Sequence, residues 1–194
     1  MPQAFTSEQM DKIRARLFES ACRHAVSPGL KKTTIESLTD DAGISKSTFY
    51  KFYDSKERLF FEVAEYWENM IISEVERILH TAGDLTSKER AAKAVNAAFE
   101  RLKSMKIIRF FVEDLPLLIT SVPQEVTMDH YRSMSLLIVD TLKKENVQFS
   151  VSDEIMASVI HILYLCIQSI QELGEDFFDA FRELVLSACE KMMS

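Results

Sequence analysis

Apolar residues recur with the period of an α-helix over most of the chain, and turn-forming residues separate the periodic stretches. The first helix is predicted to run from a cap at Thr6 to about Val26, just before Pro28. Only 4 glycines and 4 prolines occur in 194 residues, too few for the many turns of an all-β protein. Further helices are expected over residues 55–80, 86–104, 106–115, 124–144, 152–173 and 176–193, with a break bracketed by Pro116 and Pro123.

Three helix starts and one tight turn follow each other within residues 33–59. In the middle, Gly43 can end one helix in a left-handed conformation and Ser45 can cap the next, which we expect to reach about Tyr53. Helix, tight turn and helix in this order predict a helix-turn-helix. Capping boxes are expected on both sides of it, formed by Thr33 with Glu36 and by Asp54 with Glu57.

The same stretch resembles the TetR (tetracycline-repressor) family of bacterial transcription regulators. The resemblance rests on a threonine pair, Ile-x-x-Leu, Ala-Gly-Ile-Ser, x-x-Thr-Phe-Tyr, an aromatic residue and Ser-Lys-Glu-x-Leu, and it departs at Ser47, where the family often has glycine. Elsewhere the chain is similar to the family in length and helical character only. The resemblance implies an all-α fold of about nine helices. A three-helix DNA-binding domain would occupy residues 1–54, and a larger helical effector-binding and dimerisation domain residues 55–194.

A helix-turn-helix reads DNA by laying its second helix in the major groove. Short polar side chains at the start of that helix reach base edges, while hydroxyl groups and lysines around it hold phosphates. Some of these residues also have a plain structural interpretation, as a cap, as packing or as solvated charges. We expect base contacts from Lys46, Ser47 and Thr48, phosphate contacts by motif matching from Thr34, Tyr50 and Lys56, and either role for Lys51.

The charges are unevenly distributed. Residues 1–60 contain 10 Lys or Arg and 8 Asp or Glu, whereas the remaining residues contain 13 and 22, for a net charge of −7. An acidic body limits indiscriminate DNA binding and leaves contact to one region. The three cysteines are odd in number and widely spaced, which is typical of reduced thiols in a cytoplasmic protein, and no apolar run is long enough to span a bilayer.

The last two predicted helices carry apolar residues on two faces each, and both faces need to be buried. The family resemblance implies a homodimer through a four-helix bundle, although a thick monomeric core would give the same pattern. Which face serves the dimer is left open by the sequence. The candidates for the dimer interface are Ile155, Val159, Ile162, Cys166, Phe178, Val185 and Cys189.

No catalytic set is recognisable in the body. The four histidines are scattered without metal-ligand spacing, and neither a glycine-rich phosphate loop nor a nucleophile elbow occurs, so no enzyme activity, cofactor or metal is expected. The resemblance implies a pocket for a small molecule instead, and each candidate for it could equally be a core residue. They are Phe110, Phe111, Leu115, Met128, Tyr131, Met134, His161, Tyr164 and Gln168.

These features together predict a cytoplasmic, dimeric transcriptional regulator. We expect a repressor that leaves a palindromic double-stranded operator when a small apolar or amphipathic effector binds. One alternative is an architectural or cell-division factor that uses the same helix-turn-helix under the control of a protein partner. Another is a helical enzyme or binding protein that carries a vestigial DNA-binding domain.

Overall fold

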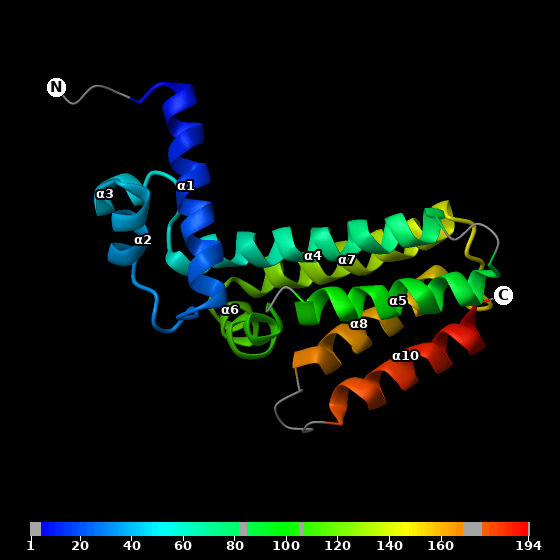
Figure 1. Ribbon diagram of the computed structural model, residues 1–194. Coiled ribbons are helices and arrows are strands. Elements are labelled where there is room, and N and C mark those ends of the chain that lie inside the picture. Colours follow the sequence, from blue (N-terminus) through cyan, green and yellow to red (C-terminus); the bar gives the residue numbers. More distant parts are fainter. Residues whose placement is uncertain (1–4, 82–84, 105–106, 169–175, 194) are drawn as a thin grey trace.

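The computed structural model describes residues 5–81, 85–104, 107–168 and 176–193, which form an all-helical fold (Figure 1). Nine α-helices and one π-helical segment lie in these residues, in agreement with the expected fold class. The first three helices form a small head, α1 (Ser7–Val26), α2 (Ile35–Ala42) and α3 (Lys46–Phe49). The body contains α4 (Lys56–Thr81), α5 (Ser87–Ser104), η1 (Phe110–Asp114), α6 (Leu115–Ser121), α7 (Gln124–Lys144), α8 (Asp153–Gln168) and α10 (Phe177–Met192).

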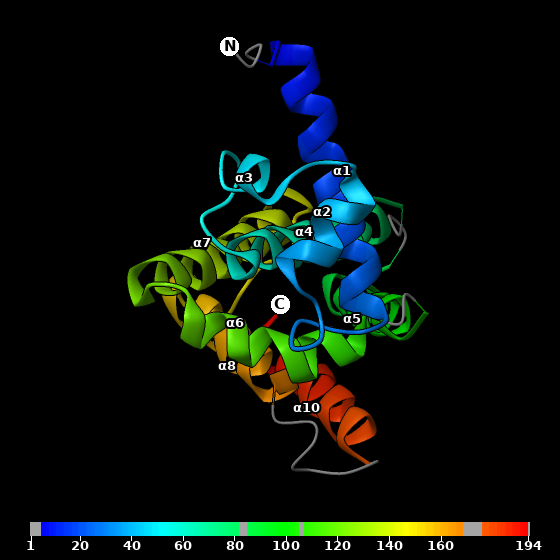
Figure 2. The ribbon, with the colours of Figure 1, turned by 90° about the vertical axis from the view of Figure 1, so that its left-hand side faces the viewer.

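The long helix α4 connects the head to the body. It leaves the head and runs along the body beside α5 and α7 (Figures 1 and 2). Helix α8 packs against α7, and α10 packs against α5. Leu17, Leu38 and Phe49 from the head share one buried apolar cluster with Phe60 from α4 and Phe110 from η1. A second cluster, around Leu79, Phe99 and Phe181, fills the distal half of the body. The head therefore has no separate core, and its orientation depends on the body.

The turn of the helix-turn-helix forms as predicted. Gly43 has a left-handed backbone, with φ at 67°, and the Ser45 hydroxyl accepts the backbone N–H of Thr48 at 3.2 Å. Helix α3 is shorter than expected, because after Phe49 the chain continues to Tyr53 in tight turns. Their hydrogen bonds include those of a 3₁₀-helix, such as the one from the backbone N–H of Phe52 to the carbonyl of Phe49, three residues earlier.

The cap of α2 lies one residue later than predicted. Thr34 is the N-cap, because its hydroxyl accepts the backbone N–H of Ser37 at 3.1 Å and the Ser37 hydroxyl reaches back to the N–H of Thr34 at 3.2 Å. The Thr33 side chain is buried and donates to the carbonyl of Gly29 at 2.7 Å. The expected capping box of Thr33 and Glu36 is wrong, since Thr33 stabilises the preceding loop instead.

The start of α4 also differs from the prediction. Ser55 caps this helix, with its hydroxyl accepting the backbone N–H of Arg58 at 3.1 Å, where we expected a capping box of Asp54 and Glu57. The capping serine lies directly before the first helical residue, whereas Asp54 lies one residue too early for its carboxylate to act at this position.

Pro116 does not interrupt the chain as expected. Segment η1 passes directly into α6, and Pro116 lies in the first turn of α6, where a missing N–H is tolerated. The N–H of Leu115 donates to the carbonyl of Phe110, five residues earlier, which is the wide turn of a π-helix. The predicted bounds of α1, α5 and α7 agree with the structure within a residue, while residues 169–173 of the predicted eighth helix lie outside the described residues.

The loop between α1 and α2, residues 27–34, is attached to the body. The backbone N–H of Leu30 donates to Asp114 Oδ2 at 3.0 Å, and Arg109 Nη2 donates to the carbonyl of Ser27 at 3.1 Å. Asp114 is buried, and burial raises the pKa of its carboxyl group, against the hydrogen bond from Leu30 and the charge of Arg109. Gly29 has a φ of 81°, and a Cβ there would lie 3.1 Å from Asp114 Oδ2.

Among the helices described here, none combines the length and the apolar character that crossing a membrane requires.

Gly29→Ala is expected to destabilise the protein more than Gly43→Ala. Both glycines have left-handed backbones, and alanine in that conformation costs about 1–2 kcal/mol. A Cβ at Gly43 would meet nothing within 4 Å. At Gly29 it would lie 2.9 Å from Arg109 Nη2 and 3.1 Å from Asp114 Oδ2, so it would push on both groups that hold the loop and weaken the hydrogen bond between Asp114 and Leu30, at a further cost of about 1 kcal/mol. Urea unfolding of both variants measures the difference, and equal losses would show that the attachment yields without cost.

Candidate DNA-binding surface and body cavity

The start of α3 presents two of the three residues predicted to contact bases. Lys46 and Ser47 are exposed, and the Lys46 ammonium group lies 3.3 Å from the carboxylate of Glu36, a surface pair worth at most about 1 kcal/mol. Thr48 differs, because it is only 9% exposed and its hydroxyl lies 2.9 Å from that of Ser45. The structure therefore places Thr48 in the cap of α3 rather than on the surface.

Of the residues predicted to contact phosphates, all except the half-buried Lys56 are exposed. Thr34 is exposed at the N-terminus of α2, and Tyr50 is 56% exposed just after α3. Lys51 is exposed as well, with its ammonium group 5.3 Å from the ring centre of Phe5. Together with Lys46, these residues give the head an outward set of hydroxyl and ammonium groups around α3. Figure 2 views the ribbon of α3 from the head end of the molecule.

Lys56 was predicted to contact a phosphate group, but the structure gives it a structural role. Its half-buried ammonium group donates to the carbonyls of Leu30 at 2.8 Å and Thr33 at 2.7 Å. Two of its three donors are thus engaged inside the protein. Lys56 attaches the loop of residues 27–34 to the start of α4, on top of the attachment through Asp114.

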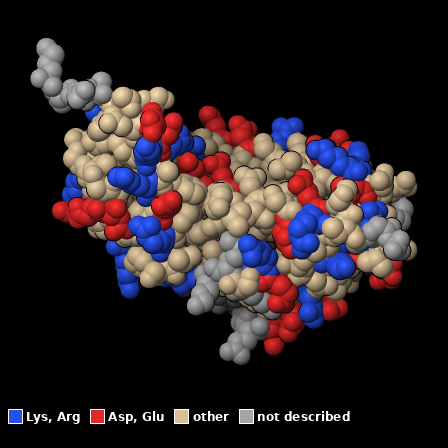
Figure 3. Space-filling model, turned by 45° about the horizontal axis from the view of Figure 1, so that its top comes forward, with Lys and Arg blue, Asp and Glu red and all other residues tan. Residues whose placement is uncertain are grey.

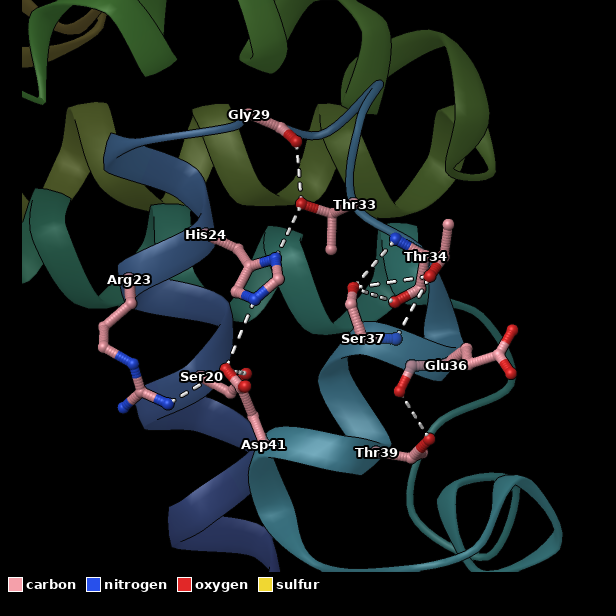
Figure 4. A network of polar contacts seen from close by, with 10 residues as sticks. All are labelled: Ser20, Arg23, His24, Gly29, Thr33, Thr34, Glu36, Ser37, Thr39 and Asp41. Carbon is pink, nitrogen blue, oxygen red and sulfur yellow. Dashed lines mark hydrogen bonds and ion pairs between the residues drawn. The ribbon is translucent and has the colours of Figure 1, made fainter.

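A polar network that the sequence analysis missed fixes α1 against α2 (Figure 4). One carboxylate oxygen of Asp41 contacts Ser20 at 2.8 Å, Arg23 at 3.1 Å and His24 at 3.3 Å. The hydrogen bonds from Ser20 and Arg23 lower the pKa of the Asp41 carboxyl group. His24 continues the network to the Thr33 hydroxyl at 3.1 Å. The i, i+3, i+4 spacing of the three donors on α1 was the available signal.

The charges on the face of the molecule shown in Figure 3 give no separate indication of a DNA site. Basic and acidic side chains are interspersed over the face shown in Figure 3, without one continuous basic patch. This agrees with the mild basicity of the first 60 residues. DNA contact by this chain would thus depend on a few placed groups more than on bulk charge.

An apolar cavity of about 250 Å³ lies in the body between α4, α5, α7, α8 and α10. Of the predicted ligand residues, Phe111, Met134 and Tyr164 line it. Most of its wall comes from aliphatic and aromatic residues that were not predicted, chiefly Ile72, Val75, Phe99, Ile138, Leu163 and Phe181. These residues looked like ordinary helix faces in the sequence, because a cavity wall and a packed core have the same periodicity.

Of the other predicted ligand residues, those whose side chains are described do not line the cavity. Phe110 and Leu115 are buried in the cluster shared by head and body, and Met128 is 62% exposed. Tyr131 and His161 stack on each other between α7 and α8, with ring centres 5.2 Å apart. The side chain of Gln168 lies outside the described part of the chain.

The predicted dimer residues fall on both faces of α8 and α10. Ile155 and Ile162 are 52% and 58% exposed on α8. Val185 and Cys189 are buried within the protomer and line the cavity, so the assignment of these two to a dimer interface is wrong. The helices are apolar on two sides, and only packing shows which side faces inward. Val159 is half-buried at the cavity wall, and Cys166 and Phe178 pack half-buried against the distal apolar cluster.

A buried polar group adjoins the cavity. Glu68, which is 4% exposed, accepts a short hydrogen bond from the Tyr164 hydroxyl, and its Oε2 lies 2.8 Å from His130 Nε2. His130 Nδ1 lies 3.6 Å from Glu65 on the other side. Burial opposes the charge of His130, but its contacts with Glu65 and Glu68 outweigh this effect and raise its pKa to about 9. Of these residues, only Tyr164 was predicted from the sequence to contact a ligand.

Residues 17–63 match the family model described as "Bacterial regulatory proteins, tetR family". The chain is 29% identical over 97 residues to the HTH-type transcriptional regulator YerO of Bacillus subtilis, and 29% identical over 98 residues to the HTH-type transcriptional repressor KstR2 of Mycolicibacterium smegmatis. These alignments cover 50% of this chain but only 34% and 47% of the two relatives.

Solved structures show the same fold over almost the whole chain. The resorcinol complex of RolR superposes with a TM-score of 0.62 at 20% identity, covering 94% of this chain and 89% of RolR. Thermus thermophilus FadR, a repressor in complex with lauroyl-CoA, superposes with a TM-score of 0.61 at 17% identity, covering 91% and 93%. At these identities the likeness shows a shared fold.

Lys46→Ala and Tyr50→Ala are expected to affect DNA binding in different ways. Lys46 lies where a groove-bound helix reaches base edges, so its loss should change sequence preference by about 1–3 kcal/mol at one position. Tyr50 lies where a phosphate contact is expected, so its loss should weaken binding to all sequences alike. Selection from a pool of random duplexes measures both, with Lys93→Ala on α5 as the control. Unchanged affinity and preference for Lys46→Ala would contradict the groove assignment.

His130→Gln is expected to flatten the pH dependence of stability above neutrality. The pKa of His130 rises from 6.5 to about 9 on folding. Its stabilising contribution is therefore complete below pH 6.5 and is lost as the pH rises towards 9, by about 3 kcal/mol at most. Urea unfolding at several pH values measures this loss, and the exposed His80→Gln variant should keep it. A His130→Gln variant with the pH dependence of the parent protein would contradict this prediction.

Proposed function

Because the chain belongs to the TetR family of transcriptional regulators, which are DNA-binding proteins rather than enzymes, we propose that it acts as a dimeric repressor released by a small apolar or amphipathic effector. Residues 1–54 would bind the operator, and residues 55–194 the effector and the second subunit. The observation that carries this proposal is the apolar cavity of about 250 Å³ in the body. An apolar cavity of this size favours a small-molecule effector over control by a protein partner.

The relatives support an effector of this kind. The solved structures of RolR and of Thermus thermophilus FadR hold resorcinol and lauroyl-CoA, respectively. Both ligands have a largely apolar part, and the cavity of this chain is lined almost entirely by apolar side chains.

Two elements connect the cavity with the head. Helix α4 lines the cavity with Ile72 and holds the loop of residues 27–34 through Lys56 at its other end. Segment η1 lines the cavity with Phe111 and holds the same loop through Asp114. An effector that shifts either element moves the head with it. Ligand binding then favours a state in which the two heads of a dimer no longer fit half-sites roughly 34–36 Å apart.

The dimer would form through the outer faces of α8 and α10. Ile155, Ile162 and Leu165 form an exposed stripe on α8, at 52%, 58% and 44% exposure, and Leu184 on α10 is 54% exposed. Large apolar side chains exposed together in this way are typical of an interface between subunits. A two-fold arrangement of these faces brings four helices together and presents two heads to a palindromic operator.

Ile162→Glu is expected to give a monomer that binds operator DNA at least about tenfold more weakly, because a charge in the interface leaves only one head per protein. Leu137→Glu is the matched control, since Leu137 is an exposed apolar residue on α7, and this variant should remain a dimer. Light scattering measures the mass, and fluorescence anisotropy measures operator binding.

The same binding assay tests effector release. Operator DNA is obtained by selection from random duplexes, and apolar and amphipathic compounds that raise the Tm of the protein are then added. The proposed function expects at least one such compound to lower operator affinity. Compounds that stabilise the protein and never alter operator affinity would contradict release, and a dimeric Ile162→Glu variant would contradict the interface.

A further inference from the structure

Among the described residues that line the cavity, Glu68, Thr141 and Tyr164 have side chains with oxygen atoms. All three are engaged in the surrounding structure. The Tyr164 hydroxyl donates to Glu68 Oε1, and the Thr141 hydroxyl donates to Glu76 Oε1 at 3.2 Å. The second carboxylate oxygen of Glu68 is buried 2.8 Å from His130 Nε2. These polar groups therefore pair with the protein and are not available to a ligand.

The backbone of the lining residues is hydrogen-bonded as well. All of them except Met193 lie within helices, where N–H and carbonyl groups bond to one another. The wall also includes the end of α10, where carbonyl groups need other partners. There the carbonyl of Cys189 accepts the N–H of Met193 at 3.1 Å, and the carbonyl of Met192 accepts the N–H of Ser150 at 2.9 Å.

The rest of the described wall is apolar. It consists of aliphatic and aromatic side chains and of the sulfur-containing side chains of cysteine and methionine, whose sulfur atoms are weak hydrogen-bond partners. A hydroxyl group that moves from water into such a space loses its hydrogen bonds to water without replacement. This loss is far more costly than transfer into a solvent that can hydrogen-bond. A bridging water molecule would not offset it, because the water would need several polar partners of its own.

We propose that the cavity selects hydrocarbons, such as two-ring aromatic compounds, and rejects the same molecules once they carry a hydroxyl group. The apolar wall stabilises each carbon atom that it removes from water, but it gives a hydroxyl group no partner. This inference rests on the proposed effector role of the cavity and narrows the effector to fully apolar compounds. The volume of about 250 Å³ exceeds the cavity of about 150 Å³ that holds benzene in an engineered protein, so a two-ring compound has a matching size.

The test compares 2-methylnaphthalene with 2-naphthol, which is uncharged at pH 7 and has a hydroxyl group in place of the methyl group. Equilibrium dialysis with the full chain should show that 2-methylnaphthalene binds at least about hundredfold more tightly, because the cavity resembles a hydrocarbon solvent. A smaller preference would overturn the inference, since an environment that can hydrogen-bond would give it as well. Absence of 2-methylnaphthalene binding would also overturn it.

Val185→Thr places a hydroxyl group in the wall with little change of volume. It should narrow the preference by about threefold or more, because the new hydroxyl can pair with that of 2-naphthol. Val139→Thr is the matched control, since Val139 is buried on α7 without lining the cavity, and this variant should keep the preference. Val159→Thr on α8 repeats the test if Val185→Thr does not fold. An unchanged preference in the folded wall variant would contradict the role of the wall.

Ala94→Leu, which fills part of the cavity, should weaken the binding of 2-methylnaphthalene and so locate it there. Operator binding is measured separately. If 2-methylnaphthalene binds with the expected preference but operator affinity stays constant, the selectivity of the cavity stands and the proposed release mechanism fails. If a hydroxylated compound binds as tightly as its hydrocarbon analogue and releases the operator, the proposed function stands and the selectivity is wrong.

Discussion

The attachment of one loop to the body determines how the body and the head of this protein can influence each other. Residues 27–34 lie between the first two helices of the head, and the body holds them through the buried Asp114 carboxylate and the Lys56 ammonium group. Left-handed Gly29 lets the loop approach Asp114 this closely. Both anchors belong to elements, η1 and α4, that also line the cavity. The head is therefore connected to the cavity by two routes, and it shares one apolar cluster with the body instead of having its own.

Helix α4 contacts the head, the cavity and the distal apolar cluster. Its start holds the head, its middle carries Glu68 at the cavity wall, and its end packs in the distal cluster through Leu79. A ligand in the cavity would contact Ile72 and Val75 of α4 and would therefore act on the same rigid element that positions the helix-turn-helix. Removing one partner of a buried ion pair is strongly destabilising, because it leaves the other charge uncompensated. The group of Glu68, His130 and Tyr164 thus suits a position where geometry has to be kept precise.

The differences between prediction and structure have local physical causes. Thr33 has the spacing of a cap, but the tertiary structure uses its hydroxyl in the loop, and the cap moves to Thr34. Lys56 has the position of a phosphate-binding residue, but its ammonium group donates to two carbonyls of the folded loop. Pro116 is compatible with a continuous helical path because a π-turn precedes it. In each case a contact from a distant part of the chain, or a rare backbone turn, overrides the local signal.

The sequence alone determined the helical fold, the helix-turn-helix with its turn at Gly43, and the family, because these depend on local periodicity and on residue types at fixed spacing. It also indicated two apolar faces on α8 and α10, without showing which one faces inward. Only the tertiary structure decided that Val185 and Cys189 line the cavity while Ile155 and Ile162 remain exposed. It also decided that Glu68 and His130, 62 residues apart in the sequence, meet at 2.8 Å beside the cavity. Such choices depend on how helices pack against one another, and periodicity within a single helix contains no information about its neighbours.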